Sequence, residues 1–118
     1  MTDTISFNLQ VAIKEGQLES FRSLMEEMVA STQEEPGTLN YEWFLSPDEK
    51  SCHIYERYQD SPSILIHLSK LGLMFAPRLL ACVDPVGLVV YGDPSAEVRA
   101  LLDSFGPVYF SPFGGFVR

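Results

Sequence analysis

The fold is decided by residues 35–68, which read EPGTLNYEWFLSPDEKSCHIYERYQDSPSILIHL. The apolar and aromatic residues at positions 39, 41, 43 and 45 alternate with Asn, Glu and Phe at positions 40, 42 and 44. This period of two is typical of a strand with two different faces. Residues 52–58 repeat this alternation, and Pro47 in the intervening SPDEK fits a tight turn. The stretch therefore predicts a turn, a strand, a hairpin loop, a second strand and the start of a helix.

The hairpin needs a register, because the register decides which side chains share a face. We expect Tyr41 to lie opposite Tyr55 and Trp43 to lie opposite His53. Trp43 is then a packing residue, either in the core or at a dimer interface. With aromatic and aliphatic residues on both faces, the hairpin predicts a sheet that is covered on both sides.

The rest of the chain supplies further periodic patterns. They predict, in order, a strand at 5–14, an amphipathic helix at 17–34, a helix from 60–62 broken at Gly72, a short helix at 73–82, a strand at 83–91, a helix at 96–105 and a strand at 108–110. This order indicates an α+β, ferredoxin-like split β-α-β fold with an antiparallel sheet. Helices cover one face, so we expect a second copy to cover the other, giving a homodimer.

Composition narrows the range of functions. The 118 residues suit one domain, residues 1–118, with a core at 5–91 and a C-terminal helix and tail extension at 94–118. A net charge of −8 and a pI near 4.5 argue against partners such as nucleic acid or an anionic membrane. The N-terminus lacks the pattern of a signal peptide, and no apolar run approaches membrane-spanning length. Cys52 and Cys82 suit reduced buried thiols, so we expect a cytoplasmic protein without a metal.

Three pieces of sequence together point to a family. Residues 35–37 (EPG) precede a strand with Tyr41, residues 54–58 (IYERY) are followed by QDS, and His67-Leu68 lies in the next helix. Over residues 5–91 the chain resembles the antibiotic biosynthesis monooxygenase family of dimeric α+β barrels, which includes quinol monooxygenases. The resemblance implies a cofactor-independent oxygenation, with O2, of a small aromatic, phenolic or quinol-like substrate in a pocket between sheet and helices.

The resemblance also assigns positions in that pocket. Family members that act on aromatic polyketides carry Asn, Trp, Tyr and Arg where this chain has Ile54, Tyr58, Ile64 and Arg78. Only the Arg is kept, which implies a different substrate or no such activity. Haem-degrading members have a Trp where His67 stands, so the resemblance disfavours haem.

The candidate catalytic residues are His67, Glu56 and Arg78. His67 could be a general base near neutral pH or a boundary residue bonded to a carbonyl or to Glu56. Glu56 is costly to bury unpaired, so we expect a structural pair with His67 or Arg78, or a carboxyl tuned for catalysis. The candidate substrate contacts are Tyr58, Ile54, Ile64, Asn40 and Phe75.

An alternative of another class is a ligand-binding or structural dimer that performs no chemistry. It predicts that the polar candidates pair with one another while Ile54, Ile64 and Phe75 fill the space.

Overall fold

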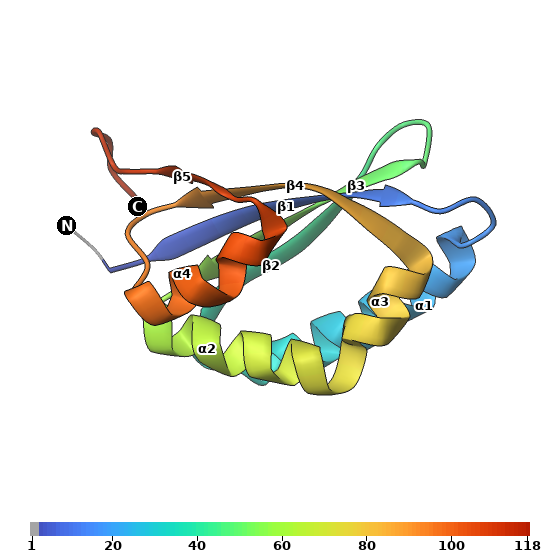
Figure 1. The fold of residues 1–118 in the computed structure, drawn as a ribbon, viewed down its shortest axis with the longest axis horizontal. Helices are drawn as coiled ribbons and strands as arrows, with labels where there is room; N and C mark the ends of the chain where they lie inside the picture. The colour runs from blue at the N-terminus through green and yellow to red at the C-terminus, as the bar shows by residue number, and fades with distance from the viewer. Residues whose placement is uncertain (1–2) are drawn as a thin grey trace.

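Five strands form one sheet in the order β2-β3-β1-β4-β5 in the computed structural model, which describes residues 3–118 (Figure 1). The strands are β1 Ile5–Ile13, β2 Thr38–Leu45, β3 Ser51–Tyr58, β4 Val83–Tyr91 and β5 Val108–Phe110. Every pair of neighbours is antiparallel except β4 and β5, which run parallel. The predicted ferredoxin-like α+β fold is confirmed.

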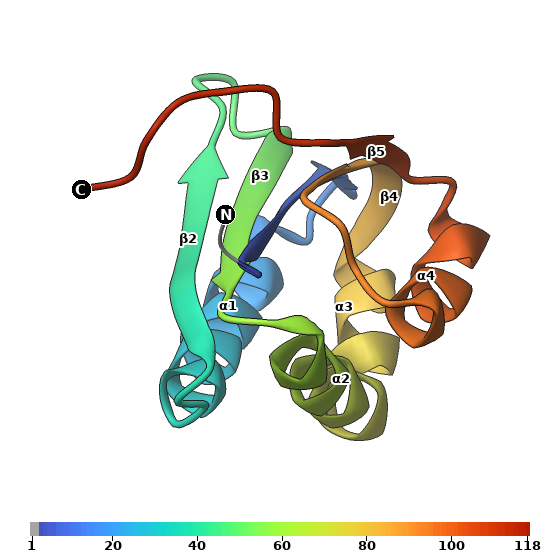
Figure 2. The same ribbon diagram turned by 90° about the vertical axis from the view of Figure 1, so that its left-hand side faces the viewer.

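The helices lie on one side of this sheet (Figures 1 and 2). They are α1 Leu18–Gln33, α2 Ser61–Lys70, the π-helical turn η1 Leu71–Phe75, α3 Ala76–Cys82, α4 Ala96–Leu102 and the 3-10 turn η2 Asp103–Phe105. Helix α2 begins as the sequence predicts, because Asp60 Oδ1 accepts a hydrogen bond of 2.9 Å from the Ser63 amide. Gly106 follows η2 in the left-handed conformation, with φ of 64°, as expected of a helix stop.

At the predicted break, Gly72 lies in a π-helical turn: α2 ends at Lys70, and the second short helix begins at Ala76, later than the predicted Leu73. The turn η1 joins α2 to α3, so Ser61–Cys82 forms one helical segment of 22 residues with a mean hydropathy of 1.4. By length and composition alone such a segment could cross a membrane, so the expectation that no run approaches that length was wrong. Its Ile64 and Phe75 are nevertheless buried in the core.

The predicted hairpin register is wrong by one residue. Trp43 pairs with Ile54 and Tyr41 pairs with Glu56, and Leu45 pairs with Cys52 at the hairpin loop. An irregularity between Thr38 and Asn40 then returns Thr38 to the predicted register, opposite Tyr58. A shift of one residue changes which side chains share a face. Tyr41 and Trp43 therefore face the helices, on the same side of the sheet as Glu56.

The core has two clusters of buried side chains between sheet and helices. One is centred on β1, β3, α1 and α3, and the other on β1, β4, α2 and α4, with Leu9 packed against both. The face turned away from the helices is less covered. It and the C-terminal tail carry exposed large apolar residues, including Phe44, Tyr91, Phe110, Phe113 and Phe116.

The turn before β2 makes a first prediction. A Cβ atom at Gly37 would lie 2.0 Å from Ser63 Oγ and 2.6 Å from Ser63 Cβ, on the first turn of α2. Since this space is already filled, Gly37→Ala should lower the free energy of unfolding by about 1–3 kcal/mol, as measured by urea denaturation. At Gly72 an added Cβ would meet nothing within 4 Å, so Gly72→Ala is the matched control and should not destabilise the protein. In a Ser63→Gly background the cost of Gly37→Ala should fall. An equal cost in both backgrounds would contradict the clash.

Candidate functional site

The centre of the candidate site is His67, a buried side chain on α2 held between two carboxylates. Its Nδ1 lies 3.0 Å from Glu35 Oε1, and its Nε2 lies 3.4 Å from Glu56 Oε1. Glu35 comes from the turn before β2, and Glu56 comes from the helix-facing side of β3. The burial of all three side chains excludes water from these contacts.

The Glu56 carboxyl lies on the Nε2 side of His67. The hydroxyl of Tyr58, two residues along β3 and fully buried, donates a hydrogen bond to Glu56 Oε1. Burial raises the pKa of the Glu56 carboxyl, and the charge of His67 and the bond from Tyr58 only partly oppose this effect. Glu56 is therefore the carboxyl that accepts a proton more readily.

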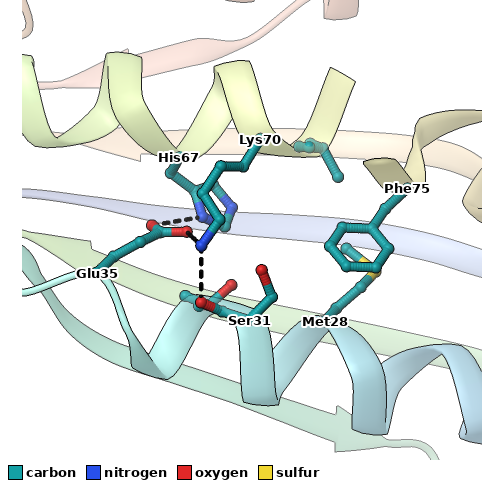
Figure 3. A pocket seen from close by; sticks show the side chains of 8 residues that line it. Met28, Ser31, Glu35, His67, Lys70 and Phe75 are labelled. Carbon is teal, nitrogen blue, oxygen red and sulfur yellow. Dashed lines mark hydrogen bonds and ion pairs between the residues drawn. The ribbon is translucent and has the colours of Figure 1, made fainter. Parts of the chain in front are cut away.

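The Glu35 carboxyl, on the Nδ1 side of His67, is ionised. Thr38 Oγ1 donates to Glu35 Oε1 at 2.9 Å. Lys70 Nζ lies 3.3 Å from Glu35 Oε2 and donates to the Ser31 carbonyl at 2.8 Å (Figure 3). Burial alone would raise the pKa of Glu35, but the hydrogen bond and charge of His67, with the bonds from Thr38 and Lys70, lower it overall. Glu35 is thus a carboxylate that is hydrogen-bonded to His67 and Thr38 through Oε1 and ion-paired with Lys70 through Oε2.

These charges act on the imidazole. Burial by itself would lower the pKa of His67, but the hydrogen bond to Glu35 and the charges of Glu56 and Glu35 outweigh it and raise that pKa. We call Glu35, His67, Glu56 and Tyr58 the acid–base cluster. Two carboxyls with pKa values pushed in opposite directions around one imidazole can hold and pass a proton.

Aromatic rings continue the cluster along the helix-facing side of the sheet. The ring of Tyr41 lies 5.3 Å from that of His67 and 5.7 Å from that of Trp43. Trp43 in turn lies 5.5 Å from Phe21 of α1. The rings form a row from His67 to the N-terminal half of α1.

The cluster is closely packed. Glu35, His67, Lys70 and Phe75 meet in the gap between α1 and the α2–η1 segment, which has no room for a water molecule (Figure 3). Ile54 and Ile64 are buried and fill adjoining space in the core. Among residues 3–118, no group of His, Cys, Asp and Glu side chains is arranged to hold a metal ion.

The structure brings together some of the predicted site residues and separates others. Glu56 pairs with His67, one of the two partners predicted for it. Arg78 does not join them, so the alternative pair of Glu56 with Arg78 was wrong. Arg78 lies on α3 with its guanidinium 3.1 Å from Glu27 Oε1, in an exposed contact with α1. Asn40 lies on the other face of the sheet, where its Nδ2 is 3.3 Å from Glu42 Oε1.

Sequence reasoning missed Glu35. It stands before Pro36-Gly37 and reads as part of a turn, although its side chain is buried beside His67. The signals available were its charge, which many exposed turn residues share, and its place in the EPG motif, which we used only to recognise the family.

The sheet with helices on one face places the chain in the ferredoxin-like α+β class, with a buried acid–base cluster between the two layers. The family model for "Antibiotic biosynthesis monooxygenase" matches residues 4–71. The chain belongs to this family.

Solved structures share the fold. MupZ from Pseudomonas fluorescens is 24% identical with a TM-score of 0.88, over 99% of this chain and 96% of that one. SnoaB from Streptomyces nogalater, a cofactor-independent oxygenase, is 18% identical with a TM-score of 0.68, over 80% of this chain and 97% of that one. The likeness to MupZ therefore takes in the C-terminal extension. Among curated proteins, no sequence matches significantly.

Proposed function

We propose that the chain is a cofactor-independent monooxygenase that oxidises a small aromatic, phenolic or quinol-like substrate with O2, as a cytoplasmic homodimer. The observation that carries the proposal is His67 buried between an ionised Glu35 and a Glu56 bonded to Tyr58. Membership of a family that includes cofactor-independent oxygenases supports the reaction class.

The chemistry needs a base and a dry site. An electron-rich phenol that has lost a proton can reduce O2 itself. In an anthrone, a CH2 group then becomes a carbonyl with one oxygen atom, and the other oxygen leaves as water with the two hydrogens. The acid–base cluster would take the first proton on Glu56, the carboxyl that accepts a proton more readily, and return a proton to the departing oxygen from the charged His67. The apolar surroundings keep competing water away.

Substrate entry requires the packed site to open. We propose that the α2–η1 segment moves away from α1, because the gap between them borders His67 and Lys70 and is too narrow to admit a substrate. Leu73 and Met74 on η1 are exposed, so moving this segment breaks few core contacts at these two positions.

Oxygen uptake with a panel of quinols and anthrones tests the proposal. We expect wild type to exceed the uncatalysed rate, and Tyr58→Phe and Glu56→Gln to lose about 10²-fold or more in kcat, the usual effect of removing general acid–base help. Arg78→Ala is the control, because Arg78 pairs with Glu27 at the surface and should keep wild-type uptake. Uptake equal in all four proteins, or no uptake with any substrate, would overturn the oxygenase.

The second candidate is a non-catalytic binding or structural dimer. It is favoured by one observation: Glu56 and His67 pair with each other and leave no room for water beside them. The same uptake panel separates the two candidates. Sedimentation of the Phe44→Ser variant tests the homodimer, since Phe44 is exposed on the sheet face that the helices do not cover.

A further inference from the structure

A second cavity lies away from the acid–base cluster, between the N-terminal half of α1 and the β2–β3 hairpin. Its volume is about 130 Å³. Six of its seven lining residues are apolar, aromatic or thiol side chains: Leu18, Phe21, Met25, Trp43, Leu45 and Cys52. The seventh is Arg22, whose side chain is 47% exposed and so lies at the mouth. The cavity is thus an apolar pocket with a single cation at its opening.

The size of the pocket limits what can enter it. An engineered apolar cavity of about 150 Å³ in another protein binds benzene. A pocket of about 130 Å³ therefore takes one six-membered ring or a chain of about six carbons. A larger ring system would not fit without movement of the walls.

The positive charge of Arg22 at the mouth of the pocket favours an anionic ligand. Arg22 is the only charged residue in the lining, and its Nε lies 3.9 Å from Glu19 Oε1, a loose contact with a carboxylate that is itself 85% exposed. The guanidinium keeps donors free for a planar carboxylate. Burial raises the pKa of the Cys52 thiol to about 11, so no negative charge inside the pocket opposes an anionic ligand at neutral pH.

We propose that this pocket binds a small monocarboxylate, with an apolar ring or chain of about six carbons against Phe21 and Trp43 and its carboxylate on Arg22. The site goes beyond the proposed oxygenation and does not depend on it, because binding here needs neither O2 nor His67.

Trp43 provides a direct measurement, since it is the one tryptophan of the chain and forms a wall of the pocket. The probes are cyclohexylacetate and cyclohexylacetamide, which have the same shape, differ in charge and do not absorb at 295 nm. In a fluorescence titration excited at 295 nm, we expect both to give saturable changes. The carboxylate should bind about three- to fivefold more tightly, the size of a partly exposed ion pair.

Three variants test whether the probes bind in this pocket and whether Arg22 causes the preference for the carboxylate. Arg22→Gln should remove the preference for cyclohexylacetate and leave binding of the amide unchanged. Arg57→Gln, on β3 but on the other face of the sheet, is the matched loss of charge and should keep the preference. Leu18→Phe should fill the pocket and weaken both probes, with circular dichroism confirming that each variant is folded.

The proposal is overturned if neither probe changes Trp43 fluorescence saturably, or if acid and amide bind wild type equally. It is also overturned if Arg22→Gln retains the preference. Each of these results is obtained without an activity assay, so none of them bears on the oxygenase.

Discussion

Replacing His67 with alanine is expected to lower the free energy of unfolding at pH 7 by about 3–5 kcal/mol, the cost of removing one partner from buried charged pairs. The variant leaves Glu35 and Glu56 buried without the imidazole that lies 3.0 Å from one and 3.4 Å from the other. Lys70 still compensates Glu35, but no other cation among residues 3–118 forms an ion pair with Glu56. Urea denaturation followed by circular dichroism measures the loss.

His53→Ala is the matched control, because the chain has two histidines and His53 is exposed on the other sheet face. It should change stability by less than about 0.5 kcal/mol. Adding Glu56→Gln to the His67→Ala protein should recover part of the loss, since a neutral amide replaces the carboxylate left without its cation. A loss of under about 1 kcal/mol for His67→Ala would show that the three side chains are not tightly coupled.

The fold could be predicted because its elements are long and cleanly periodic. The alternation in residues 5–13 and 51–58, and the helical spacing in 18–33, each favour one type of element. Their order then leaves few topologies that obey the connection rules. The parallel strand Val108–Phe110, on the edge of the sheet, was also predicted as a strand, although its short length did not reveal its partner.

The hairpin register could not be predicted from the same alternation. Two registers that differ by one residue give equally regular patterns, and the choice is made at the hairpin loop, where the Ser46 amide donates to the Ser51 carbonyl and Leu45 lies opposite Cys52. The polar residues of this loop fit either register. Because of this error, Trp43 was predicted on the same face as His53, whereas it faces the helices. The pocket under α1, which Trp43 lines, was therefore not predicted.

The acid–base cluster was half predictable. Glu56 was expected to pair with His67 or Arg78, because it shares a strand face with Ile54 and Tyr58 and a buried charge requires a partner. Which other charged residue joins Glu56 and His67 depends on which face of each helix meets the sheet. Arg78 lies on the outer side of α3, beside Glu27, whereas the turn at residues 35–37 directs Glu35 inward.

The acid–base cluster should also make stability depend on pH in a definite direction. The pKa of His67 is raised above its ordinary 6.5, so its contribution to stability is present below pH 6.5 and lost as the pH rises through the folded-state value. The pKa of Glu56 is also raised, so its contribution to stability is present below pH 4.5 and is lost as the pH rises through the folded-state value. The lowered pKa of Glu35 acts oppositely, so its contribution is present above 4.5 and lost as the pH falls through the folded-state value.

The free energy of unfolding is therefore expected to be highest in mildly acidic solution and to fall as the pH rises above 6.5. Urea denaturation from pH 4 to pH 9 measures this profile, and NMR titration of the imidazole signals, assigned with His53→Ala, measures the pKa of His67 directly. In Glu35→Gln the pKa of His67 should drop, because the strongest favourable partner of the imidazolium is gone, and the decline in stability should begin at lower pH. Stability that stays level or increases from pH 6.5 to pH 9, or a wild-type His67 that titrates below 6.5, would mean that desolvation outweighs the two carboxylates. In that case His67 would be a neutral imidazole in the folded protein, able to accept a proton but with none to give.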